Sequence, residues 1–237
     1  MSGDAIRRGA DGTDGIDPLY DWEAYRSTAL RAPRERLVIL PERFADVAIP
    51  VYGDGEVGET DADLTVQHDG EPLGERIIVT GRVVGSDGHP VPNTLIEIWQ
   101  ANAAGRYRHA NDQHPAPLDP NFTGAGRCLT DAEGNYRFVT VKPGAYPWRN
   151  HENAWRPAHI HLSIFGRLLS ERLVTQMYFP GDPLFDADPI FQSVRDPAAR
   201  QRMISSFDWE NTTPEWALGY RFDIVLGGRH ATPEDPD

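Results

Sequence analysis

The second half of the chain alternates apolar and polar residues in short segments, as strands half-buried in a sheet do. The pattern predicts six strands, at residues 76–84, 94–100, 135–141, 158–165, 173–179 and 220–226. Turn signals separate several of them, including SDGHPVP after Val84 and DAEG at 131–134, as hairpins require. The sequence therefore predicts an all-β fold, an antiparallel β-sandwich, over residues 75–237.

Residues 1–74 are predicted to form an N-terminal arm with irregular and short-helical structure. Its first 20 or so residues are rich in Gly and Asp and poor in large apolar residues, so we expect a flexible tail or an arm ordered by a partner. Short helices are predicted at 21–33, where Pro33 ends the helix, and at 197–209.

Two connections, at residues 101–127 and 142–157, are too long to be simple turns. They are rich in Tyr, Trp, Arg and His, and they contain no Ser and a single Glu. Such side chains are poorly suited to solvating a loop and well suited to lining a pocket. We therefore predict that both loops are ordered and functional.

Composition excludes several classes of function. Lys and Arg number 23 against 36 Asp and Glu, and the net charge of −13 argues against nucleic acid and anionic membranes as partners. The single cysteine, Cys128, excludes an internal disulfide and a multi-cysteine zinc site. No segment resembles a signal peptide or is apolar enough to span a bilayer, so a soluble cytoplasmic protein is expected.

The stretch RPAHIHLSIFG places two histidines one residue apart on a predicted strand. Apolar residues occupy the alternate positions and suit the core, so His159 and His161 point the other way. Their backbones lie roughly 6 to 7 Å apart by strand geometry, close enough for both rings to reach one ion. The spacing is permissive: hydrogen-bonded or surface histidines, and zinc, copper, manganese or iron as the metal, all remain open.

Carboxylate ligands are missing near the pair, because the first acid that follows is Glu171. The available oxygen donors are Tyr107 and Tyr146, one in each long loop. A phenol, with a pKa of about 10, becomes a ligand at neutral pH only when a strong Lewis acid stabilises the phenolate. A set of two histidines and two tyrosines would therefore favour Fe(III) over Fe(II) or zinc.

Most of the chain resembles the intradiol ring-cleaving dioxygenases, from about Gly74 to Leu226. The segments that carry the resemblance are GERIIVTGRVV, PVPNTLIEIWQANAAGRYRHANDQ, APLDPNFTGAGRCLTDAEGNYRFVTVKPGAYPWRN, WRPAHIHLSIFG, LVTQMYFPGDPL and YRFDIVL. DWEAYRSTALRAPRERLVILP also looks like the N-terminal region of that family.

The resemblance implies one non-heme Fe(III) per chain, bound by Tyr107, Tyr146, His159 and His161. Tyr146 would leave the metal when substrate binds, and Arg156 would be a catalytic cation beside the substrate ring. The residues that the resemblance places around the substrate are Tyr25, Trp99, Trp148, Gln176 and Ile190.

The implied reaction is cleavage of an aromatic diol by O₂ between its two hydroxylated carbons. We expect protocatechuate as substrate and 3-carboxy-cis,cis-muconate as product, in the β-ketoadipate route of aromatic catabolism. The implied partner is a homologous α subunit, which would complete the pocket in an αβ protomer of a larger oligomer. The alternatives are catechol or hydroxyquinol as substrate, and a non-catalytic β-sandwich subunit.

Overall fold

The computed structural model describes residues 16–35, 57–58, 60–148, 155–166 and 172–235; most of the predicted N-terminal tail lies outside these ranges. The described strands are β1 (Arg76–Gly85), β2 (Leu95–Gln100), β3 (Ala125–Leu129), β4 (Asn135–Val141), β5 (Tyr146–Pro147), β6 (Trp155–Arg156), β7 (His159–Ile164), β8 (Leu173–Tyr178), β9 (Ser206–Phe207), β10 (Leu218–Arg221) and β11 (Ile224–Leu226). The described helical segments are α1 (Thr28–Arg31), the 3₁₀ helix η3 (Phe185–Ala187), α3 (Pro189–Ser193) and α4 (Pro197–Gln201).

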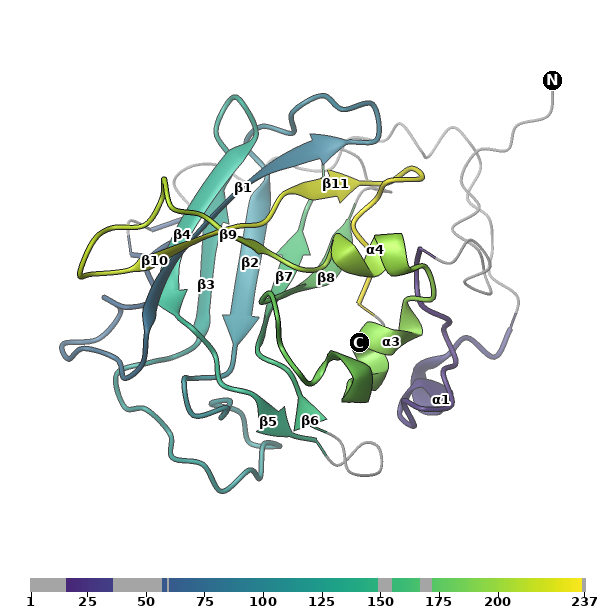
Figure 1. The fold of residues 1–237 in the computed structure, drawn as a ribbon, viewed down its shortest axis with the longest axis horizontal. Helices are drawn as coiled ribbons and strands as arrows, with labels where there is room; N and C mark the ends of the chain where they lie inside the picture. Colours follow the sequence, from purple (N-terminus) through teal and green to yellow (C-terminus); the bar gives the residue numbers. More distant parts are fainter. Residues whose placement is uncertain (1–15, 36–56, 59, 149–154, 167–171, 236–237) are drawn as a thin grey trace.

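Two main sheets face each other across one core (Figure 1). One sheet has the strand order β3-β2-β7-β8 and is antiparallel throughout. The other is built around β1, which pairs antiparallel with β4 and parallel with β10 and β11. The predicted all-β sandwich is confirmed, and one of its sheets is mixed, since the C-terminal strands return to β1 from a distant part of the chain.

Alternate residues of each strand fill the core, as the period of two requires. Ile96 and Ile98 of β2 meet Ile160 and Leu162 of β7 on one side of it, and Phe138 of β4 contributes from the opposite sheet. Burying one such side chain stabilises the fold by about 1.5 to 3 kcal/mol. The remaining side chains of β2, β7 and β8 point to the outer face of this sheet, away from the core.

Two strand predictions needed revision. Residues 220–226 form parts of two strands, β10 and β11, which pair with β1 in one parallel register that is interrupted where Gly81 meets Phe222. A Cβ atom at Gly81 would lie 1.9 Å from the Phe222 carbonyl oxygen, so only glycine permits this close approach. Strand β3 was not predicted, and it begins inside the segment 101–127 that was predicted to be loop.

The helices are shorter than predicted. The expected helix at 21–33 is the single turn α1, and that at 197–209 is the five-residue α4. Helix α3 was not predicted, and it begins with Pro189 after an N-terminal cap by Asp188, whose side chain accepts from the Ile190 amide. In Figure 1, α3 and α4 lie beside β8, against which they pack.

The chain before residue 75 also contributes to the core. Leu64 is fully buried, and its amide donates to the Val139 carbonyl of β4. The division at residue 75 remains a prediction. Within the described ranges, every helix is too short or too polar to cross a lipid bilayer.

Candidate metal centre

Strand β7 carries the two histidines on the face that points away from the core. Ile160 and Leu162 lie between the sheets, so His159 and His161 project to the opposite side. That side is nevertheless enclosed, because His159 is 2% exposed and His161 is 6% exposed. Loops and neighbouring side chains therefore cover the outer face of β7 and create a buried polar site.

The two long loops bring Tyr107 and Tyr146 to this site. The Tyr107 amide donates to the Asp112 carboxylate at 2.7 Å, which holds the first loop in a compact turn. Tyr146 starts β5 and is paired with Arg156 of β6 in an antiparallel ladder of two residue pairs. Because β6 leads directly into β7, this pairing sets Tyr146 next to the histidines.

The four rings form a closed circuit. Ring centroids lie 5.4 Å apart for Tyr107 and Tyr146, 5.6 Å for Tyr146 and His159, 4.9 Å for His159 and His161, and 6.3 Å for His161 and Tyr107. Rings at these separations can direct one atom each toward a shared centre. The structure thus brings together all four predicted ligands.

Both imidazoles are oriented by bonds at Nδ1. His159 Nδ1 lies 2.7 Å from the Pro157 carbonyl oxygen, and His161 Nδ1 lies 3.3 Å from Asp235 Oδ2. These oxygens only accept, so Nδ1 carries the proton and Nε2 keeps its lone pair. Burial lowers the pKa of both imidazoles, and the Arg156 cation adds to the effect at His159. Both rings are therefore neutral, as metal ligands must be.

The phenol oxygens are weakly bonded within the described part of the chain. Among the described residues, the buried Tyr107 Oη has no hydrogen-bond partner, and Tyr146 Oη lies 3.4 Å from His159 Nε2. Burial raises the pKa of Tyr107 well above its ordinary value and raises that of Tyr146 as well. A buried hydroxyl without a partner costs about 1 to 3 kcal/mol, which a metal ion binding at Oη would remove.

The donor set fits a hard, strongly acidic metal ion. Among the described residues, no three His, Cys, Asp or Glu side chains gather into a metal-sized cluster. The donors nearest the histidine pair are phenols, whose protons only a strong Lewis acid displaces at neutral pH.

Arg156 lies fully buried against this ring circuit. Its Nη1 is 3.2 Å from His159 Nε2, and its Nε and Nη2 donate to both carboxylate oxygens of Asp188 at 3.2 and 3.0 Å. Burial alone would lower the pKa of Arg156, but the Asp188 charge holds it well above its ordinary value. A permanent cation, held by two hydrogen bonds to one carboxylate, therefore lies beside the candidate metal site.

Three predicted pocket residues gather around Arg156. Trp148 lies under the guanidinium with a distance of 5.6 Å from Cζ to the ring centre, and it packs edge to face on Tyr25 at 4.7 Å. Ile190 is fully buried in α3 and donates its amide to Asp188 Oδ1 at 3.1 Å. Their contact with a substrate remains a prediction.

Gln176 and Trp99 make mainly structural contacts. Gln176 Oε1 accepts from Arg156 Nη2 at 2.5 Å and from Tyr178 Oη at 2.8 Å, and its Nε2 donates to Asp235. The Trp99 indole stacks on His161 with 4.9 Å between centroids and 7° between planes. Both lie against the site, and their contact with a substrate remains a prediction.

Sequence reasoning missed three residues: Tyr178, Asp188 and Asp235. Tyr178 was on the outward phase of a predicted strand, and Asp188 precedes a proline, a helix-start signal that could have been noticed. Asp235 had no local signal. Burial alone would raise the pKa of Asp235, but hydrogen bonds from His161 and Gln176 hold it below its ordinary value, so it is an ionised carboxylate.

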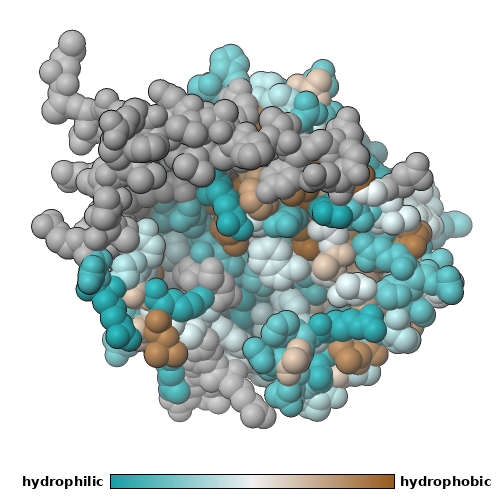
Figure 2. All heavy atoms as spheres, turned by 180° about the vertical axis from the view of Figure 1, so that it is seen from behind, coloured by the Kyte–Doolittle hydropathy of each residue, from teal (hydrophilic) through white to brown (hydrophobic). Residues whose placement is uncertain are grey.

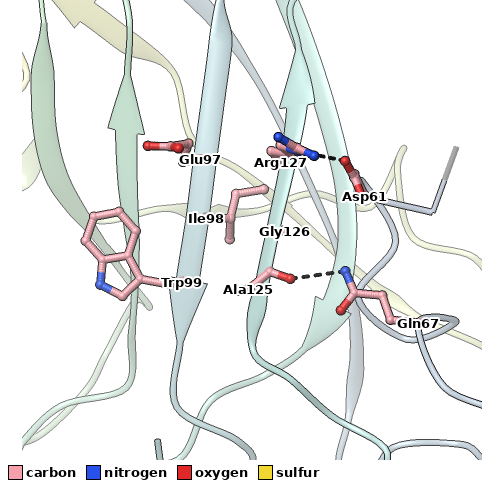
Figure 3. Close-up of a pocket in the computed structure, with 8 residues that line it drawn as sticks. All are labelled: Asp61, Gln67, Glu97, Ile98, Trp99, Ala125, Gly126 and Arg127. Atoms are coloured by element: carbon pink, nitrogen blue, oxygen red, sulfur yellow. Dashed lines mark hydrogen bonds and ion pairs between the residues drawn. The ribbon is translucent and has the colours of Figure 1, made fainter. Parts of the chain in front are cut away.

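A separate groove of about 430 Å³ lies on the outer face of β2 and β3 (Figure 3). An ion pair between Arg127 and Asp61 at 2.7 Å crosses its upper part, and Gln67 donates to the Ala125 carbonyl at 3.1 Å. Trp99 is the residue that it shares with the histidine site, and none of the four predicted ligands lines it. We therefore place the chemistry at the ring circuit and not in this groove.

Where Figure 2 colours the surface by hydropathy, that face is largely hydrophilic, with hydrophobic residues in small separate patches.

Comparison with known proteins identifies the relationship. Residues 47–228 match the dioxygenase family, and residues 11–43 match the N-terminal region of protocatechuate 3,4-dioxygenase beta subunits.

Individual relatives agree with these matches. The protocatechuate 3,4-dioxygenase beta chain of Burkholderia cepacia is 62% identical over 218 residues, covering 91% of this chain and 92% of that one. The alpha chain of the Pseudomonas putida enzyme is 30% identical, covering 67% of this chain and 75% of its own. The structure of 3-chlorocatechol 1,2-dioxygenase from Rhodococcus opacus 1CP is 25% identical with a TM-score of 0.52, over 75% of this chain and 70% of that one. The chain therefore belongs to the family of intradiol ring-cleaving dioxygenases.

Proposed function

We propose that this chain binds non-heme Fe(III) and cleaves protocatechuate with O₂ between its two hydroxylated carbons, giving 3-carboxy-cis,cis-muconate. The 62% identity to a protocatechuate 3,4-dioxygenase beta chain over nearly the full length supports the substrate. The observation that carries the chemistry is the circuit of two phenols and two neutral imidazoles, in which the buried Tyr107 Oη has no hydrogen-bond partner among the described residues.

The proposed ligands are Tyr107, Tyr146, His159 and His161. Bound there, ferric iron would supply a Lewis acid that holds both diol oxygens and draws electron density from the aromatic ring. The two imidazoles are held from the back by their Nδ1 bonds, which suits them to stay in place throughout turnover.

Tyr146 has the properties of an exchangeable ligand and base. It lies in a two-residue strand, and its Oη makes a long contact of 3.4 Å to His159 Nε2. Burial raises its phenol pKa, so a Tyr146 phenolate freed into this pocket is a strong base. Its Oη would accept a proton from a hydroxyl of the arriving diol.

Arg156 supplies fixed positive charge where negative charge develops on the substrate ring. Because Asp188 and Gln176 hold the guanidinium in a buried site, it needs little reorganisation during the reaction. Losing such a preorganised group costs about 2 to 4 kcal/mol of barrier. Trp148, packed on the same guanidinium, would form one wall for the aromatic substrate.

A homologous α subunit is the proposed partner. The similarity to both a beta and an alpha chain supports an αβ protomer in which the partner completes the pocket. A chain with net charge −13 that binds an anionic carboxylate also needs local positive charge, part of which the partner would supply.

The decisive experiment is an oxygen-uptake assay on this chain co-expressed with its α partner, with protocatechuate, catechol and hydroxyquinol compared at equal concentration. We expect protocatechuate to be cleaved fastest and the iron-loaded protein to show a visible tyrosinate-to-iron charge-transfer band. Tyr107→Phe should remove or strongly weaken the band, whereas Tyr220→Phe, a buried tyrosine of β10, should leave it unchanged.

The outcomes separate the alternatives. A preference for catechol or hydroxyquinol would replace the substrate. Iron without the band would refute the tyrosine ligands, and no activity on any diol would favour the non-catalytic subunit.

A further inference from the structure

The C-terminal segment, residues 232–235, is bonded to β8 and β11 along its length; we call it the C-terminal strap. The Thr232 amide donates to the Val225 carbonyl, the Pro233 carbonyl accepts from Thr175 Oγ1 at 2.7 Å, and the Asp235 amide donates to the Val174 carbonyl at 2.7 Å. In Figure 1 this yellow segment runs from β11 past α4 toward α3. The strap thus reaches the outer face of the sheet that carries the histidines.

The strap ends with a carboxylate inside the site. The Asp235 side chain is fully buried, and its Oδ2 accepts from Gln176 Nε2 at 2.5 Å and faces His161 Nδ1 at 3.3 Å. Gln176 cannot be turned the other way, because its Oε1 accepts from Arg156, which only donates. The Asp235 carboxylate is therefore held by Gln176, whose own orientation is set by Arg156.

The two histidines differ in what stands behind them. His159 Nδ1 donates to a neutral carbonyl, that of Pro157, whereas His161 Nδ1 faces the anionic Asp235. A carboxylate behind an imidazole fixes its tautomer and makes the opposite nitrogen a stronger donor than a carbonyl does. The strap thus makes the two ligand positions unequal.

We propose that Asp235 is a positioning residue for the metal centre: through the strap it holds His161 with Nε2 toward the metal and strengthens that ligand. This inference rests on the metal-binding role proposed above for His161. The C-terminal strap lies far from the other site residues in sequence. In this proposal it sets the donor strength of one iron ligand.

The test compares Asp235→Asn with Glu234→Gln in the full αβ protein. Asn has the size of Asp and lacks its charge, and Glu234 is the adjacent carboxylate of the same strap. We expect Asp235→Asn to lose iron to a chelator on the order of 10-fold faster than wild type. A weaker His161 donor leaves the iron more electron-poor, so the tyrosinate-to-iron band should move to longer wavelength. Glu234→Gln should match wild type in both measurements.

A measurement on the unmodified chain does not depend on how the variants fold. In iron-free wild-type protein labelled with ¹⁵N-histidine, His161 should appear as the Nδ1-protonated tautomer, and the opposite tautomer would overturn the inference. Iron retention and band position unchanged in Asp235→Asn would overturn it while leaving the proposed function intact. A wild-type protein that holds iron without a tyrosinate band would overturn both.

Discussion

The metal centre has two halves that are built differently. The histidine half lies on β7, where each ring is buried and held at Nδ1 by an acceptor. The tyrosine half comes from the two long connections, with Tyr146 in the two-residue strand β5. Among the described residues, Tyr107 Oη has no hydrogen-bond partner, and Tyr146 Oη makes a long contact of 3.4 Å to His159 Nε2. A strand inside a sheet can hold a ligand in one place, whereas a loop can release one. The contrast suits a site that must keep its metal and still exchange a ligand for substrate.

Replacing one ligand from each half should give the largest difference, because the histidine variant should lose iron and the tyrosine variant should lose turnover. His161→Ala should lower iron affinity on the order of 100-fold or more. Replacing a residue that only supports a ligand already lowers metal affinity by about 10- to 100-fold, and losing the ligand itself should cost at least as much. Tyr146→Phe should keep most of its iron, because its position is the exchangeable one, and should instead lose turnover. Iron per chain, measured after dialysis against a chelator, checks both. Equal iron loss in the two variants would contradict the division into a holding half and an exchanging half.

Arg156 belongs with the rigid half, and replacing it should reduce turnover while iron stays bound. The expected loss is about 30- to 1,000-fold, which corresponds to 2 to 4 kcal/mol of barrier. Replacing Arg156 alone also leaves the buried Asp188 carboxylate without its ion-pair partner, which costs about 3 to 5 kcal/mol of stability. The double variant Arg156→Met with Asp188→Asn should recover stability but not turnover. Turnover that recovers together with stability would reduce Arg156 to a structural role.

Trp99 tests how far the rigidity of the histidine half depends on stacking. Trp99→Leu should lower the free energy of unfolding by about 1 kcal/mol, because the stacked contact with His161 is lost. Trp209→Leu is the matched control, since Trp209 is 77% exposed and its replacement should change stability by less than about 0.5 kcal/mol. Urea titration of the two iron-free variants measures the difference, and equal effects would show that the stack adds nothing.

Replacing Cys128 tests the strand framework behind the site: ionisation of its thiol should have no effect on stability at neutral pH and a measurable one only in alkali. Burial raises the pKa of its thiol from 9.0 to about 12, so the folded chain keeps a proton that the unfolded chain loses above pH 9. Between pH 9 and 12 this thiol should therefore reduce the free energy of unfolding by about 1.4 kcal/mol per pH unit. Cys128→Ala should show a shallower alkaline decline, and identical slopes would mean that the thiol is not protected.

Local patterns were sufficient to predict most of the fold. Alternation along β1, β2, β4, β7 and β8 marks them as strands because each has one face in the core. Strand β3 escaped prediction since Gly126 takes an inward position, where a Cβ would lie 2.5 Å from Leu64. The parallel pairing of β10 and β11 with β1 is a long-range choice that no local pattern encodes.

The site divides in the same way. Residues with an unusual local setting were found from the sequence: two histidines on an apolar strand and two tyrosines in overlong loops. Residues that act on those ligands from afar were missed. Asp235 lies 74 positions from His161, and only the folded sheet brings the two together.

The stack of Trp99 on His161 also has an optical consequence. An indole lying 4.9 Å from a ring that is predicted to bind a paramagnetic ion should have its fluorescence quenched when the ion is present. Since Trp99 is also exposed to the groove of Figure 3, its emission would respond to anything that occupies that surface. The difference in emission between wild type and Trp99→Phe would thus serve as a built-in gauge of metal loading, readable without substrate or oxygen.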